Sequence, residues 1–375
     1  MAKTVAEVPE FGEGYLEISE KGFGFLRSEE HRFQPKPTDI FVTPDTIKKR
    51  FLREGSFIKG TLQPPHRGTS PQLKEVLEIN EMPYEEFIKS SRFENLITID
   101  PIEKYNLETD PDLVETRIID LVTPIGKGTR GLIVAPPRTG KTTILKQIAN
   151  AVRTNHPDVK VMVLLIDERP EEVTDFERSV DAEVIASSND QDLETHVRLS
   201  RFTIERCRRL VESGKDVMVL MDSLTRIARA YNSAHGGSGR TMTGGVDARA
   251  LEVPRKMFAA ARKIEDGGSL TIIATALVET GSRMDELIFQ EFKGTGNCEI
   301  VLDRSLADAR IFPAININQS GTRREELLYP EKEYAKLVTL RRALADESTR
   351  NAIVSLKESV ERSETNKALL QALRD

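Results

Sequence analysis

The residues best suited to chemistry form a Gly-Lys-Thr loop near the middle of the chain. The run APPRTGKT at 135–142 follows four apolar residues and leads into a helical stretch that begins at Thr143. In such a loop, backbone N–H groups and the helix N-terminus converge on phosphate oxygens. Lys141 would reach the β- and γ-phosphates of a nucleoside triphosphate, and the Thr142 hydroxyl would bind Mg²⁺. Ala135 replaces the usual first glycine. A chance Gly-Lys-Thr is the alternative, and the strand before it and the helix after it argue against chance.

Two acidic residues stand where a phosphate loop needs them. Asp222 ends the apolar run 217–221, and Glu168 follows the apolar run 161–166. Ligands of parallel α/β sheets bind beyond the carboxyl ends of the strands. Asp222 would position Mg²⁺ through water, and Glu168 would orient and deprotonate an attacking water. A single acid at the end of a strand is commonly just a solvated residue, but the two acids together predict a hydrolytic site.

Aromatic residues near the start of the chain suggest a second kind of site. In GFGFLR at 22–27, alternation puts Phe23 and Phe25 on one face, and Phe41 offers a third ring. Bases of single-stranded nucleic acid stack on such rings for about 1–3 kcal/mol each. The alternative is that the rings fill a core. Arg27 and the glycine spacing favour single-stranded nucleic acid.

Two further loops combine flexibility with a cation. The glycine-rich run 235–245 contains Arg240, and the run 279–284 contains Arg283. Each alone reads as an ordinary surface loop. In a ring-shaped motor, both would be expected to line the pore.

The composition limits the classes of protein. The 375 residues are 38% hydrophobic and carry a net charge of −6, which predicts two or three globular domains and no broad cationic surface. Residues 1–80 balance 12 Lys/Arg against 12 Asp/Glu, so a nucleic-acid site there must depend on stacking. Cys207 and Cys298 lie too far apart to suggest a disulfide or a zinc site. The sequence contains no apolar run of membrane-spanning length, and no apolar run follows the basic residue near its start, so we expect no secretion signal, a cytoplasmic location and no membrane partner.

The elements that must position these residues fall into four expected regions. Residues 1–80 show short strands at barrel spacing, and 81–124 read as a connector. Residues 125–330 alternate buried strands with helices, which predicts a parallel sheet, and 331–375 read as helical. The expected strands of the sheet are 131–135, 160–166, 216–221 and 269–276. A helix is expected over 192–212, with Leu193, Val197, Ile204 and Val211 on one face.

Eight ordered segments together resemble the bacterial transcription termination factor Rho family, over essentially the whole chain. They are GFGFLR at 22–27, GLIVAPPRTGKTT at 131–143, LLIDERPEEVTD at 164–175, MDSLTRIARAYN at 221–232, TGGVDA at 243–248, ATALVETGSRMDE at 274–286, QEFKGTGN at 290–297 and SGTRREELL at 320–328.

The resemblance implies a RecA-like α/β ATPase domain with a parallel sheet, preceded by a small OB-fold (cold-shock-like) β-barrel. It implies a homohexameric ring that uses ATP and Mg²⁺ and moves 5′→3′ on RNA as a helicase. The barrels would capture pyrimidine-rich single-stranded RNA, and the motor would release nascent RNA from the RNA polymerase elongation complex.

The resemblance also assigns site residues, position by position. The expected catalytic residues are Lys141, Glu168 as base, Asp222 as the Mg²⁺-linked acid and Arg323 as an arginine finger on the neighbour's ATP. The expected ATP-binding residues are Gly126, Lys127, Gly128, Thr129, Arg130, Gly131, Arg138, Thr139, Gly140, Lys141, Thr142, Thr143 and Arg169. The resemblance assigns Phe23, Phe25, Arg27 and Phe41 as primary RNA contacts, and we expect their neighbours Gly22, Gly24, Leu26, Asp39 and Ile40 to belong to the same RNA site. The expected pore-side RNA contacts are Arg240, Thr241, Met242, Thr243, Gly244, Gly245 and Arg283. The expected subunit-interface residues are Arg304 and Arg310.

The chain departs from the family pattern in three places. Because the expected barrel begins within about a dozen residues of Met1, we expect no small helical subdomain of the kind that usually precedes it, and residues 68–71 lack an aromatic found there in well-studied members. Arg138, Arg240 and Arg283 replace frequent lysines, which preserves charge but not geometry.

Two other functional classes share some of these features. A catalytic-type subunit of a rotary proton-pumping ATPase has the same expected fold and a Glu-Arg after a strand, but the aromatic barrel face and the loop at 235–245 argue against it. An RNA-binding regulator with an inactive nucleotide site is disfavoured because Lys141, Thr142, Glu168 and Asp222 are all present.

Overall fold

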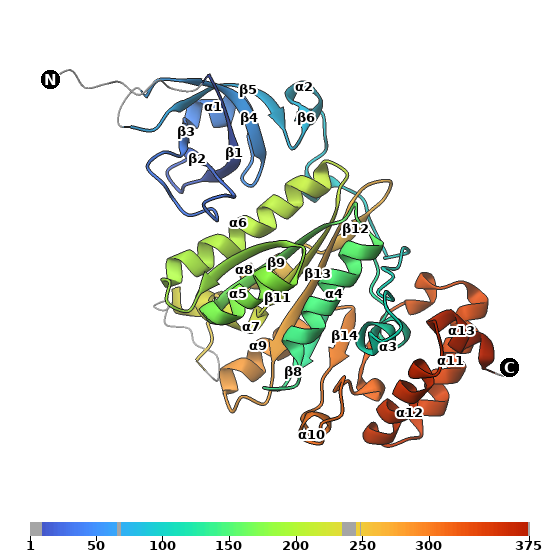
Figure 1. Ribbon diagram of the computed structural model, residues 1–375. Helices are drawn as coiled ribbons and strands as arrows, with labels where there is room; N and C mark the ends of the chain where they lie inside the picture. Colours follow the sequence, from blue (N-terminus) through green and yellow to red (C-terminus); the bar gives the residue numbers. More distant parts are fainter. Residues whose placement is uncertain (1–9, 66–68, 235–244, 248, 374–375) are drawn as a thin grey trace. The chain divides into compact units, whose positions relative to one another are not determined.

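The chain divides into two compact units (Figure 1). The computed structural model describes residues 10–65, 69–234, 245–247 and 249–373. The first unit comprises Met1–Leu96 together with Arg198–Lys215, and the second comprises Ile97–Val197 with Asp216–Asp375. The division falls at Leu96, inside the stretch expected to be a connector, and it assigns a distant helical segment to the first unit.

The first unit is a small β-barrel. Its strands are β1 (Phe11–Ile18), β2 (Gly24–Arg27), β3 (Ile40–Val42), β4 (Phe57–Gln63), β5 (Gln72–Ile79) and β6 (Met82–Pro83). Its short helices are α1 (Pro44–Lys49), α2 (Tyr84–Phe87) and the 3₁₀ turn η1 (Phe93–Asn95). The strand order is β3-β2-β1-β4-β5-β6, and a pairing of Phe41 with Gln72 joins β3 to β5 and closes the sheet.

Alternation and one glycine shape the barrel. Inward positions of the strands supply the core, with Leu16, Leu26 and Ile58 almost fully buried. A Cβ at Gly60 would lie 2.0 Å from the Glu75 carbonyl oxygen, so only glycine allows β4 and β5 to approach as they do.

The segment Arg198–Lys215 belongs to the first unit because its contacts lie there. It contains most of α6 (Leu193–Glu212). A Cβ at Gly55 would lie 2.5 Å from the Arg206 backbone nitrogen, and Asn80 Nδ2 donates to the Arg209 carbonyl oxygen at 3.1 Å. A helix from the middle of the sequence therefore completes the barrel unit.

The second unit is built on a mostly parallel sheet in the order β10-β9-β11-β13-β8-β14-β15, with β12 paired to β13 and β7 paired to β12. The strands are β7 (Thr98–Ile99), β8 (Arg130–Ala135), β9 (Lys160–Glu168), β10 (Glu183–Ser188), β11 (Asp216–Asp222), β12 (Arg262–Ile264), β13 (Ser269–Leu277), β14 (Cys298–Val301) and β15 (Gly321–Thr322). The five pairs from β10 to β14 are parallel, whereas β15 and β12 pair antiparallel with their neighbours.

Helices connect and cover these strands. They are α3 (Val114–Val122), α4 (Lys141–Asn155), α5 (Pro170–Ser179), α7 (Leu224–Ala234), α8 (Glu252–Phe258), α9 (Arg283–Lys293) and α10 (Arg304–Asp308), with 3₁₀ turns η2 (Ile317–Gln319) and η3 (Glu325–Leu328). The C-terminal helices are α11 (Glu331–Ala345), α12 (Thr349–Glu361) and α13 (Asn366–Ala372), grouped beside α3 (Figure 1).

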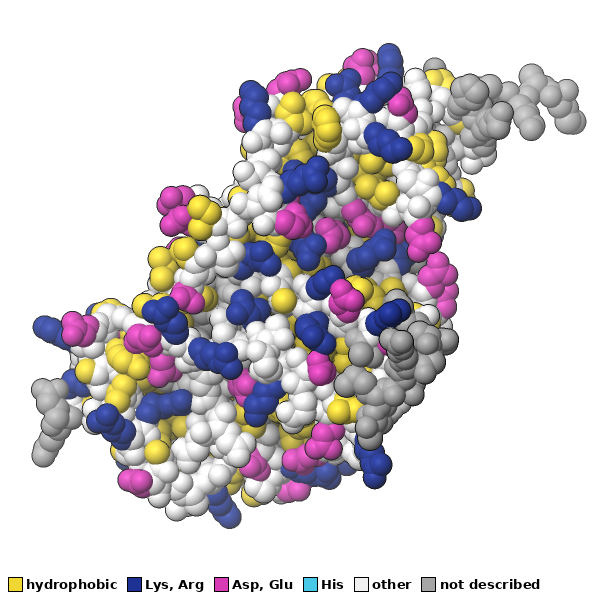
Figure 2. All heavy atoms as spheres, turned by 180° about the vertical axis from the view of Figure 1, so that it is seen from behind, with side chains coloured by type: hydrophobic (Ala, Val, Ile, Leu, Met, Phe, Trp, Pro, Cys, Tyr) yellow, Lys and Arg dark blue, Asp and Glu magenta, His cyan; other side chains and the backbone are white. Residues whose placement is uncertain are grey.

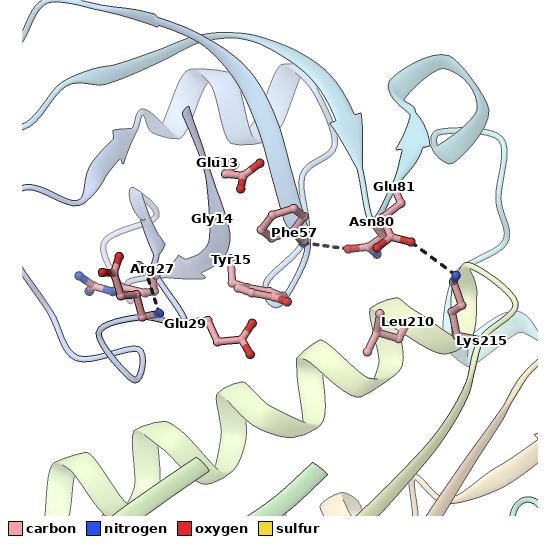
Figure 3. Close-up of a pocket in the computed structure, with 12 residues that line it drawn as sticks. Glu13, Gly14, Tyr15, Arg27, Glu29, Phe57, Asn80, Glu81, Leu210 and Lys215 are labelled. Carbon is pink, nitrogen blue, oxygen red and sulfur yellow. Dashed lines mark hydrogen bonds and ion pairs between the residues drawn. The ribbon is translucent and has the colours of Figure 1, made fainter. Parts of the chain in front are cut away.

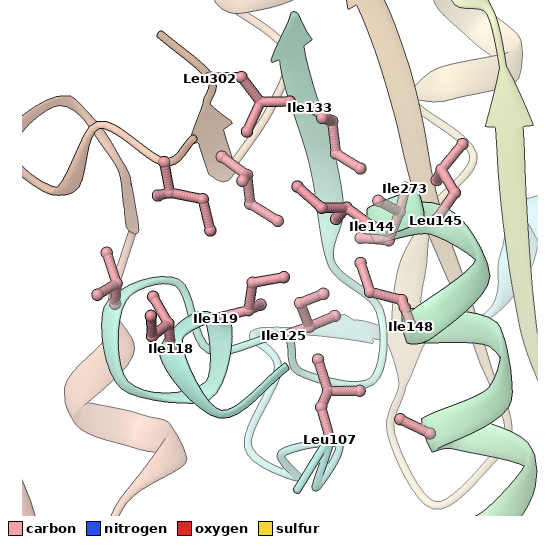
Figure 4. Close-up of a cluster of buried hydrophobic side chains, with 14 of the residues drawn as sticks. Leu107, Ile118, Ile119, Ile125, Ile133, Ile144, Leu145, Ile148, Ile273 and Leu302 are labelled. Atoms are coloured by element: carbon pink, nitrogen blue, oxygen red, sulfur yellow. The ribbon is translucent and has the colours of Figure 1, made fainter. Parts of the chain in front are cut away.

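The core of the second unit lies between the sheet, α4 and α3. Ile133 on β8, Ile119 on α3 and Ile148 on α4 point toward one another (Figure 4). The C-terminal helices extend the same cluster with Leu337, Ile353 and further leucines. This packing holds β8 and α4, the elements on either side of the phosphate loop, in place.

The structure confirms the fold class expected from the sequence. The four expected strands correspond to β8, β9, β11 and β13, and the expected helix at 192–212 corresponds to α6. The strands β10 and β14 were not expected, because their apolar runs are short. Among the described residues, no helix is long and apolar enough to cross a membrane. Positive and negative side chains alternate over the face shown in Figure 2, as the small net charge predicts.

Candidate functional site

The phosphate loop lies between β8 and α4. Gly140 has φ +90 and forms the N-terminal boundary of α4, which begins at Lys141. The Thr139 hydroxyl donates to the Pro136 carbonyl oxygen at 2.7 Å and closes the loop on itself. The first turn of α4 therefore directs its unpaired N–H groups toward the loop, as an anion site requires.

Three predicted catalytic residues meet at this loop. The Lys141 ammonium contacts the Asp222 carboxylate, and its Nζ lies 3.9 Å from Glu168 Oε2. They meet because β9 and β11 are parallel neighbours, with Asp222 aligned to Leu165, and because β8 ends at the same edge of the sheet. We call Lys141, Glu168, Asp222 and Arg226 the phosphate site.

Two residues that the sequence reasoning missed fix these acids. Arg226 Nη2 donates to Glu168 Oε1 at 3.4 Å, and the Thr275 hydroxyl donates to Asp222 Oδ1 at 2.8 Å. Both acids are 1% exposed. Burial raises the pKa of Glu168 above its ordinary 4.5, and the positive charge of Arg226 offsets this only in part. The position of Arg226, one helical turn after Asp222, was the signal available in the sequence.

The predicted ATP-binding residues separate into two groups. Thr139 to Thr143 and Arg138 lie at the loop, and exposed Arg169 follows Glu168 directly. Gly126 to Gly131 instead lie at the amino end of β8. Five strand steps of about 3.3 Å, roughly 16 Å in all, separate Arg130 from Ala135. The structure therefore does not bring this second group to the chain's own phosphate loop.

Arg323 lies with that second group. Its backbone N–H donates to the Asn297 carbonyl oxygen at 2.8 Å, and Asn297 Oδ1 accepts from the Arg130 N–H at 2.8 Å. The side chain of Arg323 is exposed, like those of Arg304 and Arg310. Arg323 therefore points outward at the end of β8 opposite the loop.

An aromatic residue that the sequence reasoning missed lies against the loop. A Cβ at Gly140 would be 3.9 Å from two ring atoms of Phe312, whose side chain is 36% exposed. Its only signal in the sequence is the dipeptide Phe312-Pro313.

Three phenylalanines form an aromatic platform on the barrel. The ring centroids of Phe23, Phe25 and Phe41 lie 5.5 to 5.8 Å from one another, and all three rings are half-buried. They lie outside the barrel's buried cluster, which argues against the core alternative. Gly24 faces inward against Leu16, and Gly22, at φ +82, makes the turn before β2.

Two of the expected RNA contacts, Leu26 and Ile40, face the interior of the barrel and not the aromatic platform. The side chains of Leu26 and Ile40 are buried in the barrel core, because alternation directs them opposite to Phe25 and Phe41. The structure therefore does not support RNA contacts by these two side chains. Arg27 is also mostly buried, and it donates to Glu17 and to Asp39 at 2.5 Å each.

The two expected pore loops are only partly described. Arg240 to Gly244 lie outside the described residues. Gly245 has φ +81, and a Cβ there would lie 3.9 Å from Met284 Cε, so the end of one loop adjoins the other. Exposed Arg283 borders a cavity of about 1030 Å³ at the carboxyl ends of β8, β13 and β14.

Family models match both units. The model of the ATP synthase alpha/beta family nucleotide-binding domain covers residues 115–322, and that of the Rho termination factor RNA-binding domain covers residues 12–85. An ATPase from a bacterial type III secretion system has the same fold over 74% of this chain and 85% of its own, with a TM-score of 0.61 at 21% identity. EscN, the type III secretion ATPase of enteropathogenic E. coli, gives a TM-score of 0.59 at 20% identity, over 73% of this chain and 71% of its own.

The fold and the phosphate site define a RecA-like ATPase joined to an RNA-binding barrel. The transcription termination factor Rho of Cereibacter sphaeroides is 50% identical over 95% of this chain and 85% of its own length. The Rho factor of Thermotoga maritima is 50% identical over 97% of this chain and 85% of its own length. The Rho factor of Chromobacterium violaceum is 48% identical over 97% of this chain and 88% of its own length. The chain belongs to the transcription termination factor Rho family. The family model of ATP synthase alpha and beta subunits, which corresponds to the rotary ATPase alternative, matches the nucleotide-binding domain at 115–322.

Proposed function

We propose that the chain is an RNA-dependent ATPase that terminates transcription by releasing nascent RNA from RNA polymerase. It would act as a homohexameric ring in the cytoplasm and move 5′→3′ on RNA as a helicase. The observation that carries this proposal is the phosphate site, with its base, acid and cation at adjacent strand ends, in a chain that also presents an aromatic platform.

The phosphate site has the groups that ATP hydrolysis needs. Lys141 would leave Asp222 and bind the β- and γ-phosphates, while the N–H groups of the loop hold the remaining oxygens. Glu168 would take a proton from the water that attacks the γ-phosphorus, and its raised pKa makes it a stronger base than an exposed glutamate. Arg226 would hold the carboxylate of Glu168 in place through its hydrogen bond.

The same site suits Mg²⁺. The Thr142 hydroxyl and the Asp222 carboxylate are oxygen ligands of the type this ion prefers, and the Lys141 ammonium already places a cation against Asp222. Thr142 would hold the ion directly and Asp222 would hold it through water. The bound ion would supply positive charge to the phosphates.

The position of Arg323 supports a ring. The residue lies near the amino end of β8, and roughly 16 Å of strand separates that end from the phosphate loop, so we propose that it acts on the nucleotide of a neighbouring subunit. Gly126 to Gly131 share that end and would face the same neighbour, and exposed Arg304 and Arg310 would lie in the interface. Phe312 would stack on the base of the chain's own nucleotide.

The aromatic platform would capture RNA. Phe23, Phe25 and Phe41 offer rings for stacking, and the pair Arg27–Asp39 presents a donor and an acceptor beside Phe25. Such a fixed pair can read the edge of a base, which fits a preference for pyrimidines. Arg283 and the loop that ends at Gly245 would contact RNA in the pore.

The decisive experiment measures ATP hydrolysis with and without poly-C RNA. We expect slow turnover alone and strong stimulation by RNA. A rate that RNA leaves unchanged would exclude an RNA-dependent motor, and absence of hydrolysis under both conditions would exclude the ATPase.

A further inference from the structure

Four charged side chains, three of them buried, form a cluster beside the aromatic platform. We call Glu17, Arg27, Asp39 and Arg198 the Arg27 cluster. Arg27 Nε donates to Glu17 Oε2 and its Nη1 to Asp39 Oδ2, each at 2.5 Å. Arg27, Glu17 and Asp39 are all less than a tenth exposed. The Arg27 guanidinium carbon lies 4.9 Å from the centroid of the Phe25 ring, so a base stacked on Phe25 would meet an oriented guanidinium.

The fourth member comes from a distant part of the sequence. Arg198 lies on α6, within the segment that belongs to the barrel unit, and outside the RNA-binding family model at 12–85. Its Nη1 donates to Glu17 Oε1 at 3.0 Å and to the Phe33 carbonyl oxygen at 3.1 Å. The two oxygens of Glu17 therefore hold one arginine each.

This geometry makes the orientation of Arg27 depend on Arg198. A buried carboxylate oxygen that loses its charged donor must turn toward another partner or remain unsatisfied. If Arg198 is removed, Glu17 can rotate about its side-chain bonds, and its hydrogen bond to Arg27 Nε loses its fixed direction. The Arg27 guanidinium would then no longer be held at one angle against Phe25.

We propose that Arg198 is a positioning residue of the RNA site. Acting through Glu17, it orients the Arg27 guanidinium beside Phe25 and so determines how strongly a base edge is read there. The ligand is an unpaired base of single-stranded RNA. This inference rests on the proposed RNA-binding role of Phe25 and Arg27.

A neighbouring arginine on the same helix provides a matched control. Arg201 Nη2 pairs with Glu54 Oε1 at 3.1 Å, so it also links α6 to the barrel, but through Glu54 instead of Glu17. If the arginines of α6 only attach the helix, Arg198→Ala and Arg201→Ala should affect RNA binding alike. If Arg198 positions Arg27, only Arg198→Ala should weaken it.

The test is fluorescence-anisotropy titration of a short cytidine oligoribonucleotide and of an adenosine oligoribonucleotide of the same length. We expect Arg198→Ala to weaken cytidine binding about tenfold, the size expected for a lost hydrogen bond between charged groups. It should also reduce the preference between the two oligonucleotides. Arg201→Ala should change either affinity less than about twofold, because the Arg201 side chain is 45% exposed and solvent screens its ion pair. Arg198→Lys should restore part of the preference.

A second variant covers the case in which Arg198→Ala does not fold. Glu17→Gln keeps the volume of the side chain, removes the charge that links the two arginines, and should reproduce the loss of preference. In an Arg27→Ala background, Arg198→Ala should cost no further affinity.

The outcomes distinguish this inference from the proposal on which it rests. If Phe25→Ala and Arg27→Ala bind both oligonucleotides like the parent, the RNA site itself is wrong. If those two variants lose affinity while Arg198→Ala and Glu17→Gln keep the parental preference, only the role of Arg198 is wrong. Equal losses in Arg198→Ala and Arg201→Ala would overturn the inference in favour of simple attachment.

Discussion

The phosphate site and the aromatic platform differ in how deeply their working groups are buried. Glu168 and Asp222 are 1% exposed and bonded to Arg226 and Thr275, whereas the three rings of the platform are half-exposed. A hydrolytic site needs few charges held in a dry place, because electrostatic interactions are strongest there. A site for a long, variable polymer needs open faces on which any base can stack.

The two sites also differ in how the chain assembles them. The phosphate site draws residues from the ends of β8, β9 and β11, which only the order of the sheet brings together. The platform comes from two neighbouring antiparallel strands, β2 and β3, in register at Phe25 and Phe41, and from Phe23 directly before β2. We therefore expect single changes in the phosphate site to abolish turnover, and changes in the platform to weaken binding by degrees.

The largest effects should come from the cations that act on phosphate. Lys141→Ala and Arg323→Ala should each reduce ATP turnover about 10³-fold or more, since cations that stabilise transferring phosphate contribute this much. Steady-state phosphate release measures this loss. The affinity of the barrel for a short RNA should remain at the parental level. A large loss of this affinity would show that the phosphate site and the aromatic platform do not act independently.

Mixing the Lys141→Ala and Arg323→Ala proteins tests whether Arg323 acts on the nucleotide of a neighbouring subunit. In exchanged rings, some interfaces would pair an intact Lys141 with an intact Arg323, so part of the turnover should return. Fully exchanged rings that stay inactive, or a protein that is monomeric under all conditions, would contradict the role given to Arg323.

Glu168→Gln should separate nucleotide binding from chemistry. The amide keeps the size of the side chain but cannot accept the proton, so turnover should fall about 10²- to 10⁴-fold. Nucleotide affinity, measured with a fluorescent ATP analogue, should change little. Substantial remaining turnover would show that another group is the base.

The platform should respond in proportion to the rings removed. Phe23→Ala combined with Phe25→Ala should cost about 2–6 kcal/mol of single-stranded RNA binding, with little change in the salt slope because no phosphate contact is lost. Anisotropy titrations at several salt concentrations measure both quantities. Circular dichroism melting is the control, and a folded double variant that binds like the parent would exclude stacking.

The smallest expected effect is a shift of pH dependence. Since burial raises the pKa of Glu168, protonation should reduce turnover on the acid side at a pH above the ordinary glutamate value of 4.5. Arg226→Ala removes the charge that opposes this rise, so the acid limb of the profile should move to higher pH. Turnover measured against pH for both proteins shows the direction in which the acid limb moves. An acid limb at the same pH in both proteins would show that Arg226 does not affect the pKa of Glu168.

Local patterns were sufficient for much of the fold and for the chemistry of the phosphate loop. The apolar runs before Ala135 and before Asp222 predicted β8 and β11, because buried parallel strands leave continuous apolar stretches. The alternation at 22–27 predicted which way Phe23 and Phe25 face. Leu26 was also expected among the RNA contacts, but the structure places its side chain in the core, because alternation directs it opposite to Phe25.

The sequence by itself determined the types of residue and their local direction: a phosphate loop at a helix start, acids at strand ends and rings on one face of a strand. Only the tertiary structure decided which of them meet. In the structure, Arg226 bonds to Glu168, and Phe312 lies against the phosphate loop. Gly126 to Gly131 lie at the other end of β8. Arg198 bonds to Glu17, although 181 positions of sequence separate the two residues. The reason is physical. The order of the strands and the docking of the helices depend on the apolar surface that the whole chain buries, and a short segment of sequence does not determine that surface.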